Sequence, residues 1–329
     1  MPAILEVEHL VKKYGDFAAV NDISFSVEEG EVFGLLGPNG AGKTQTISML
    51  TGIVEPTGGT ARIGGHDIER QLKETKQISG LVPQELALYP TLSARANLDF
   101  FGRIYGLRGR TLKERVDDVL QIVALTDRAD EPVENYSGGM KRRVNIAAGL
   151  VHQPKLLFLD EPTVGVDPQS RNHIFESVLK LNRDRGMSII YTSHYMEEVE
   201  LLCNRVAIID RGRIIALDTI RNLMAILGGG ILQVGVPTVT RQLLRELTAL
   251  PAVEEACPGD PAVAVAEESN GEPEPETQTI KIMTRDSQYA LVNVIGYLNE
   301  RDIPITSLTI LEPNLETVFL HLTGKKLRE

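Results

Sequence analysis

The sequence has few cysteines and no apolar run long enough to cross a membrane. Its cysteines, Cys203 and Cys257, lie far apart and outside any CxxC or metal-ligand spacing, which predicts two reduced thiols. No stretch approaches the roughly 18 apolar residues of a membrane span. The first residues, "MPAILEVEHL", lack the basic and apolar regions of a signal peptide. We therefore expect the chain to stay in the cytoplasm.

Positive charge is also scarce. The chain has 34 Lys and Arg against 45 Asp and Glu, which gives a net charge of −11. Sequence-independent binding to nucleic acid depends on neutralising phosphates, so no nucleic-acid partner is expected. The 329 residues are 42% hydrophobic and 24% charged, the balance of a soluble globular protein with one large or two ordinary domains.

The pattern of the sequence changes near residue 227 and predicts two domains. Up to that point short β-branched runs alternate with helical stretches, and "GGG" at 228–230 indicates a linker. Residues 231–329 then follow the order strand, helix, strand, strand, helix, strand and a last helix at "NLETVFLHL", which predicts a small α+β accessory domain of ferredoxin-like type. The stretch at about 266–277 is rich in Glu and Pro and is expected to be a mobile acidic loop.

The first domain, residues 1–227, is predicted to be α/β. Three apolar runs end in glycine or polar residues, as buried parallel strands do when the chemistry lies at their carboxyl ends. Three earlier runs predict an antiparallel sheet beside them, and residues 85–155 form a largely helical subdomain. The predicted parallel strands are "EVFGLLG", "PKLLFLD" and "MSIIYTSH", and the antiparallel ones are "ILEVEHL", "DISFSV" and "TARIGG".

The stretch "GPNGAGKT", residues 37–44, matches the phosphate-loop (Walker A) pattern G-x-x-x-x-G-K-[ST] between an apolar strand and a helix. Its glycines let backbone N–H groups close around phosphate oxygens, Lys43 reaches the β- and γ-phosphates, and Thr44 can ligate Mg²⁺. The alternative is a glycine-rich turn with a chance lysine. The residues predicted to bind the nucleotide here are Gly37, Pro38, Asn39, Gly40, Ala41, Gly42, Lys43, Thr44 and Gln45.

A second predicted strand, "LLFLDEP", supplies acidic partners in the Walker B position. Asp160 can hold Mg²⁺ directly or through water, and Glu161 can polarise an attacking water, a contribution of about 10²- to 10⁴-fold. Alone, such an Asp-Glu pair is also what a strand-ending loop contains. His194, in "YTSHYMEE", follows the next core strand and is predicted to hydrogen-bond the γ-phosphate or the water, although a lone histidine is more often structural.

The stretch "NYSGGMKRR", residues 135–143, predicts a second helix start that presents backbone N–H groups to phosphate. With the motifs above, it resembles the nucleotide-binding subunit of ABC transporters over residues 3 to about 225. The resemblance implies a head-to-tail dimer in which Ser137, Gly138 and Gly139 of one protomer contact the γ-phosphate held by the other. The alternative is a helix cap with flexible glycines.

The same resemblance implies roles for three further residues. Tyr14 matches the aromatic that stacks on adenine, and otherwise is a half-buried strand tyrosine. Gln84 matches the glutamine that senses Mg²⁺ or water and links the site to the membrane subunit, and otherwise is a loop amide. Asp167 matches the aspartate that crosses the dimer interface, although an N-cap or turn role suits Asp-Pro equally well.

The chain departs from the commonest family pattern at four positions. Tyr136 and Met140 replace Leu and Gln of the signature, and Val166 replaces a Leu before Asp167. These changes resemble the branch that exports drugs, lipids or polymers. Gln45 replaces a second hydroxyl residue that touches the α-phosphate in the family, and nucleotide binding is expected to survive its loss.

These features together predict an ATP-hydrolysing subunit, with ATP and Mg²⁺, that drives export through a membrane permease. It is expected to pair with a second copy or a paralogous subunit, peripheral on the cytoplasmic face of the membrane. The tail "LETVFLHLTG" also resembles the export branch. The alternatives are a soluble ABC ATPase acting on ribosomes or DNA, and a phosphate-loop kinase. The basic run at 141–143 is interpreted as a solvated face or an interface contact.

Overall fold

The computed structural model describes residues 2–259, 278–311 and 313–324, so the acidic loop predicted at about 266–277 lies outside the described residues. The chain divides into two compact units between Ile220 and Arg221. The sequence places this boundary near residue 227. Within the described ranges, no helix is both long and apolar enough to span a bilayer.

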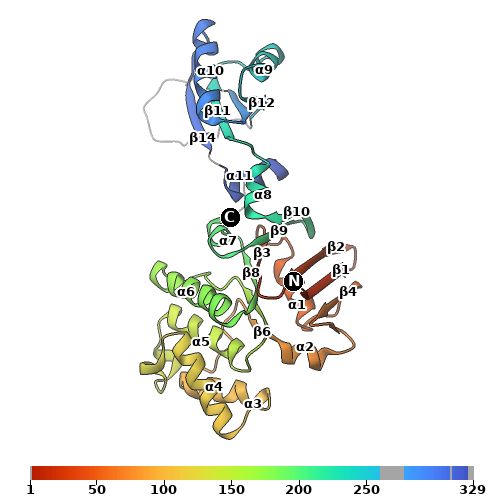
Figure 1. The fold of residues 1–329 in the computed structure, drawn as a ribbon, viewed down its shortest axis with the longest axis vertical. Helices are drawn as coiled ribbons and strands as arrows, with labels where there is room; N and C mark the ends of the chain where they lie inside the picture. Colours follow the sequence, from red (N-terminus) through yellow and green to blue (C-terminus); the bar gives the residue numbers. More distant parts are fainter. Residues whose placement is uncertain (1, 260–277, 312, 325–329) are drawn as a thin grey trace. The chain divides into compact units, whose positions relative to one another are not determined.

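The first unit is built on a six-stranded sheet in the order β10-β9-β3-β8-β7-β6 (Figure 1). Neighbouring strands are parallel except β10, which pairs antiparallel with β9. The sequence predicts β3, β7 and β8 but not the other three. In sheet order the strands are Arg213–Thr219, Arg205–Asp210, Val32–Leu36, Ser188–Ser193, Leu156–Asp160 and Ser79–Val82.

Both faces of this sheet are covered, which explains why its strands are continuous apolar runs. In β7, Leu157 and Leu159 pack in a core cluster with the helices, whereas Leu156 and Phe158 pack in a second cluster with the antiparallel sheet. Successive side chains of a strand point to opposite faces, so each face of β7 contributes two residues. A strand buried on both sides has no position for a polar residue until it ends.

The antiparallel sheet that the sequence predicts lies in the same unit, in the order β2-β1-β4-β5. Its inward residues join helix α1 in the second core cluster. Helix α2, Leu72–Ile78, follows it in the chain. The bounds of β1, β2, β4, β5 and α1 are Ala3–Tyr14, Phe17–Glu28, Gly58–Ile63, His66–Asp67 and Lys43–Leu50.

Three helices between β6 and β7 gather in one group, as the sequence predicts for residues 85–155 (Figure 1). Helix α4 buries Val116, Val119 and Leu120 on one face. Helices α6 and α7 complete the unit, and two short 3₁₀ turns, Thr126–Arg128 and Val133–Asn135, precede α5. The bounds of α3, α4, α5, α6 and α7 are Ala94–Ile104, Gly109–Ile122, Gly138–Leu150, Pro168–Arg185 and Met196–Leu202.

The second unit has the βαββαβ element order that the sequence predicts, followed by a last helix, and its antiparallel sheet has the order β12-β13-β11-β14. Leu232, Val234 and Ile280 belong to a core cluster of its own. The bounds of α8, β11, α9, β12, β13, α10, β14 and α11 are Ile220–Ala225, Gly230–Val236, Arg241–Thr248, Val253–Pro258, Gln278–Thr284, Ser287–Glu300, Ser307–Leu311 and Leu315–Thr323.

The glycine run predicted as a linker is a hydrogen-bonded turn inside the second unit. The Gly229 N–H donates to the carbonyl of Thr284, and the Thr284 hydroxyl donates to the carbonyl of Gly230 at 3.0 Å. Gly228 and Gly230 have φ of 58° and 116°, which glycine adopts without a steric penalty. The glycines therefore lead the chain from α8 into β11. Cys203 and Cys257 are both unpaired, in agreement with the predicted thiols.

Candidate nucleotide-binding site

Four loops that carry the predicted site residues meet at one edge of the parallel sheet. The phosphate loop follows β3, Gln84 follows β6, Asp160 ends β7, and His194 follows β8. These strands are neighbours, so their carboxyl ends share one edge, where open α/β sheets bind ligands. A cavity of about 360 Å³ lies there, with Tyr14, Phe17, Gly40, Lys43, Gln84 and Glu161 among its lining residues.

Glycine is required in the phosphate loop where the backbone bends or approaches a neighbour closely. Gly42 caps α1 at a φ of 111°, and a Cβ on Gly37 would lie 2.2 Å from the carbonyl oxygen of Ile209. The loop therefore delivers the first N–H groups of α1 to the cavity. A helix start carries about half a positive charge, which favours a phosphate there.

Lys43 is buried beneath this loop and is held by three oxygens. Its Nζ donates to the carbonyls of Gly37 at 2.6 Å and Pro38 at 3.0 Å. The same Nζ lies 3.0 Å from Oε1 of Glu161, and the two side chains are only 4% and 5% exposed. The predicted phosphate-binding lysine and the predicted general base therefore form a buried ion pair.

Glu161 is fixed at both carboxylate oxygens and at its backbone. His194 Nδ1 lies 3.1 Å from its Oε2, while Lys43 contacts Oε1. The backbone φ of Glu161 is 46°, which costs about 1 kcal/mol or more for a residue other than glycine, and such strain is found at functional sites. Its N–H donates to the hydroxyl of Thr192 at 2.8 Å, which helps to hold this conformation.

Asp160 lies beside Glu161 and accepts two hydroxyl hydrogen bonds. Thr192 and Thr44 donate to its Oδ1 at 2.8 and 3.2 Å. Burial raises the pKa of Asp160, and these two hydrogen bonds oppose the rise. Thr192 is a site residue that the sequence reasoning missed. The available signal was a polar residue near the end of an otherwise apolar strand.

The side chains at this point suit Mg²⁺. The ion prefers hard oxygen ligands and is usually held by one or two carboxylates together with phosphate oxygens and water. The Thr44 hydroxyl and the Asp160 carboxylate provide such oxygens next to the phosphate loop. Over the described ranges, no group of three or more His, Cys, Asp or Glu residues is placed to hold a metal by itself.

Tyr14 and Gln45 contact each other at the rim of the same cavity. The Tyr14 hydroxyl donates to Oε1 of Gln45 at 3.0 Å, and Lys12 Nζ lies 5.1 Å from the centre of the tyrosine ring. The ring is 50% exposed, so it has a face available for stacking. Tyr14, which is expected to stack on adenine, is thus hydrogen-bonded to Gln45, which replaces the second hydroxyl residue of the phosphate loop.

The signature segment gives its two glycines different surroundings. Ser137 caps α5 and accepts from the Met140 N–H at 3.3 Å. A Cβ on Gly138 would meet nothing within 4 Å, whereas a Cβ on Gly139 would lie 1.9 Å from Oγ of Ser170. Gly138 is exposed and Gly139 is buried, so only the first half of this turn is open to a ligand.

Asp167 lies next to the signature segment. Its Oδ1 accepts from the Ser170 N–H at 2.9 Å as the cap of α6, and this hydrogen bond lowers the pKa of Asp167. The N-cap alternative is therefore realised, and the exposed carboxylate remains accessible. Neither Asp167 nor the signature residues line the cavity of their own chain.

The interpretation of the basic run at 141–143 as a solvated face or an interface contact is wrong for its two arginines. Arg142 is buried and donates to the carbonyls of Gln84 at 2.7 Å and Pro83 at 3.2 Å. Arg143 donates to the carbonyl of Val123 at 2.8 Å. Burial lowers the pKa of both arginines. Arg142 therefore connects the signature helix to the Gln84 segment, a contact that the local sequence does not reveal.

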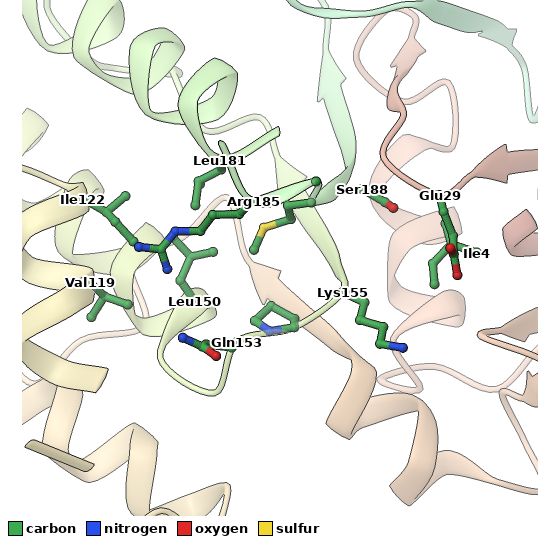
Figure 2. A pocket seen from close by; sticks show the side chains of 13 residues that line it. Ile4, Glu29, Val119, Ile122, Leu150, Gln153, Lys155, Leu181, Arg185 and Ser188 are labelled. Atoms are coloured by element: carbon green, nitrogen blue, oxygen red, sulfur yellow. The ribbon is translucent and has the colours of Figure 1, made fainter. Parts of the chain in front are cut away.

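A second cavity, of about 380 Å³, lies at the other edge of the sheet (Figure 2). Lys155 precedes β7, Ser188 begins β8, and both line it with Ile122 and Arg185. The amino ends of parallel strands face away from their carboxyl ends. None of the site residues predicted from the sequence lines this cavity.

Comparison with known proteins agrees with this geometry. A family described as "ABC transporter" matches residues 20–164. The chain is 46% identical over 327 residues to the linearmycin resistance ATP-binding protein LnrL of Bacillus subtilis, which covers 99% of this chain and 100% of that protein. It is 37% identical to the daunorubicin resistance ATP-binding protein DrrA2 of Streptomyces coeruleorubidus, over 98% and 95% of the two chains. The Nod factor export ATP-binding protein I of Ralstonia nicotianae is 37% identical, over 99% and 95%.

Solved structures share the fold of the first unit. The structure of cbiO1 from Clostridium perfringens, part of an ABC transporter complex, has a TM-score of 0.63 and 28% identity over 75% of this chain and 95% of that one. A dimeric ATP-binding cassette bound to ADP and phosphate has a TM-score of 0.59 and 24% identity over 65% and 98%, a likeness of fold. With sequence, fold and site in agreement, the chain belongs to the family of ATP-binding subunits of ABC transporters.

Proposed function

We propose that this ATPase subunit drives export of a substrate through a partner permease in the membrane. The observation that carries the proposal is the buried contact of Lys43 and His194 with the two oxygens of Glu161, at the edge where four loops meet. The export direction rests on the relatives. Two are named for resistance to linearmycin and to daunorubicin, and a third is named for Nod factor export.

Nucleotide binding begins at the two ends of the cavity. The exposed ring of Tyr14 offers a stacking face for adenine, and the N–H groups at the start of α1 receive the phosphates. Thr44 and Asp160 would hold Mg²⁺, and Gln84 also lines the cavity. When bound, Mg²⁺ neutralises charge on the β- and γ-phosphate oxygens.

Glu161 then acts on the attacking water. Phosphate oxygens compete with Glu161 for the ammonium group of Lys43, so nucleotide binding releases Oε1 to accept the proton of a water. His194 keeps its contact with Oε2 and orients the carboxylate. A positioned general base contributes about 10²- to 10⁴-fold.

A second ATPase subunit completes the site in this proposal. Ser137 and Gly138 begin α5 on an exposed surface outside their own cavity, with Asp167 beside them. In a head-to-tail pair of copies, or of paralogues, this helix start receives the γ-phosphate held by the other subunit. A phosphate-loop kinase has no use for this second turn, and a measurement of phosphate release without any acceptor would count against a kinase.

The permease is proposed to dock on an apolar surface next to Gln84. Five large apolar side chains between residues 86 and 104 are 38–63% exposed, and the rings of Tyr89 and Phe100 meet edge to face at 5.0 Å. Arg142 ties the Gln84 segment to the signature helix, so movement at the dimer contact reaches this surface. The protein is then peripheral at the cytoplasmic face. The five residues are Leu86, Tyr89, Leu92, Phe100 and Ile104.

The test is Glu161→Gln, which keeps the shape of the side chain and removes the base. We expect ATP binding to persist, phosphate release to fall about 10²-fold or more, and the ATP-loaded protein to elute as a dimer. Glu29→Gln, an exposed change at the other edge of the sheet, is the control. Undiminished phosphate release from the Glu161 variant would show that Glu161 is not the general base. Elution of the ATP-loaded variant only as a monomer would contradict the proposed dimer.

The alternative of an ATPase acting on ribosomes or DNA is not favoured. The relatives above are transport and resistance proteins, and the chain is acidic. Co-purification of the unaltered protein with ribosomal RNA or DNA at physiological salt would revive that alternative.

A further inference from the structure

Glu198 is a buried carboxylate that the mechanism above does not use. It lies on α7 and is 2% exposed. Its Oε2 accepts hydrogen bonds from the hydroxyls of Thr163, Tyr191 and Ser193, each at 2.9 Å. Across the described residues its Oε1 has no hydrogen-bond partner, and no Lys, Arg or His forms an ion pair with it.

The negative charge is needed for this arrangement. A carboxylate oxygen accepts several strong hydrogen bonds, whereas an amide oxygen has two lone pairs and brings an NH₂ group that needs acceptors of its own. Burial, and then the charge of Glu198, raise the pKa of Tyr191, so its hydroxyl remains a donor. An apolar residue of similar size would anchor α7 with a smaller desolvation cost. The charge therefore points to a role beyond anchoring the helix.

The hydroxyl donors lie on the two segments that meet at Glu161. Ser193 immediately precedes His194, and its Oγ also accepts from the Tyr195 N–H at 2.9 Å, so the chain is held on both sides of the histidine. Thr163 lies in the turn between Glu161 and α6, where its carbonyl accepts from the Val166 N–H at 3.1 Å. One carboxylate thus joins the histidine loop to the turn that leads to the exposed cap of α6.

We propose that Glu198 is a positioning residue for ATP hydrolysis, which holds His194 against Glu161 and fixes the turn that carries Asp167. The inference rests on the proposed function and adds a residue to it. Glu198 touches neither the nucleotide cavity nor Glu161, so it acts through its hydroxyl partners.

The first measurement is steady-state ATP hydrolysis by Glu198→Gln. We expect kcat to fall about fivefold or more while the Kd for ATP stays within about twofold, because the phosphate loop is untouched and only the alignment of the base is lost. Glu197→Gln, an exposed neutralisation of the neighbouring residue on α7, is the matched control and should leave both values unchanged. A smaller fall in kcat for Glu198→Gln overturns the proposal.

A double-mutant cycle with His194→Ala separates positioning from a general structural effect. If Glu198 acts through His194, adding Glu198→Gln to His194→Ala should lower kcat by less than about twofold further. Losses that multiply in full show that Glu198 acts independently of the histidine and overturn the proposal.

Ser193→Ala provides the same test should Glu198→Gln fail to fold. It removes one donor and little volume, and its kcat is expected to fall about threefold or more with the Kd for ATP retained. A smaller fall overturns the proposal. If the unaltered protein hydrolyses ATP and both variants match it, only this inference fails. If the unaltered protein has no ATPase activity, the proposed function fails and the role of Glu198 fails with it.

Discussion

The buried surroundings of Asp160 disfavour the ionised form of its carboxylate. Burial raises its pKa above the ordinary value of 3.8, so the folded state holds the proton more tightly than the unfolded state. The contribution of Asp160 to the free energy of unfolding is therefore complete at low pH and is lost as the pH rises through the raised pKa. The carboxylate proposed to bind Mg²⁺ therefore destabilises the folded protein at neutral pH when no metal is bound.

We therefore expect Asp160→Asn to gain stability relative to the unaltered protein as the pH rises. The asparagine has no proton to lose, so the difference in unfolding free energy should move in favour of the variant between the ordinary pKa and pH 7. The measurement is urea unfolding over this range in EDTA without nucleotide. A difference that is independent of pH would contradict the assigned burial of the charge.

Gln45 contacts Tyr14, so a change at Gln45 reaches the ring that is proposed to stack on adenine. Gln45→Thr restores the hydroxyl that is common in the family and removes the acceptor of the Tyr14 hydroxyl, an exposed hydrogen bond worth about 1 kcal/mol. The two effects oppose each other, so we expect the Kd for ATP to change by less than about tenfold. Tyr14→Phe, which removes the same hydrogen bond from the other side, is the control. A larger change in a calorimetric titration of Gln45→Thr would show that the glutamine touches the nucleotide directly.

Single residues differ in how far the sequence reveals them. Lys43, Glu161 and His194 follow motifs or strand ends, and the structure brings them together. Thr192 and Glu198 have no motif of their own. Their roles depend on which strands pair in the sheet and on which side chains α7 buries. The residues next to them in the sequence show neither of these.

At the scale of elements, the start of α5 packs directly on the start of α6. A methyl group on Gly139 would collide with Ser170, whereas one on Gly138 would meet open space. We expect Gly139→Ala to lower the free energy of unfolding by about 1–3 kcal/mol. Gly138→Ala should change it by less than about 0.5 kcal/mol.

Under the proposed function, Gly138→Ala still slows ATP turnover, since its methyl group lies where the γ-phosphate of the other subunit is received. Guanidinium unfolding and phosphate release measured on both variants would test this division of roles. Equal stability of the two variants would mean that the contact between the helices is looser than described.

Elements were predictable where both faces of a strand are apolar. The runs that became β3, β7 and β8 were predicted, whereas β6 and β10, at the two edges of the sheet, were not. Strand β9 is an exception, because it is apolar and lies inside the sheet but was not predicted. The sequence predicts a linker at 228–230 because glycine occurs at many kinds of backbone bend. In the structure, hydrogen bonds to Thr284, far along the chain, make this run part of the second unit.

At the scale of the whole molecule, the two units have separate cores. Every residue of the two clusters in the first unit precedes Ile220, and the third cluster lies wholly after it. The residues that line the nucleotide cavity also precede Ile220. A chain ending at Ile220 is therefore expected to unfold cooperatively and to bind ATP with a Kd within about threefold of the full chain.

Thermal unfolding and ATP titration of that shortened chain, beside the full chain, would check this. Loss of cooperative unfolding would show that the first unit depends on the second. The element order of the second unit was predictable from its alternating pattern, but its boundary was not, because α8 follows β10 directly and continues the alternation of strands and helices.

The sheet order also has a consequence for how the chain is made. Strand β3, which leads into the phosphate loop, lies between β8 and β9, and both of these come from residues that are synthesised much later. Until Ser193 has left the ribosome, the five residues of β3 have no neighbour on either side, and the side that pairs with β9 stays open until Asp210 has emerged. A stalled or truncated chain therefore exposes the strand that leads to its ATP loop, and chaperones and proteases meet it before any partner subunit does.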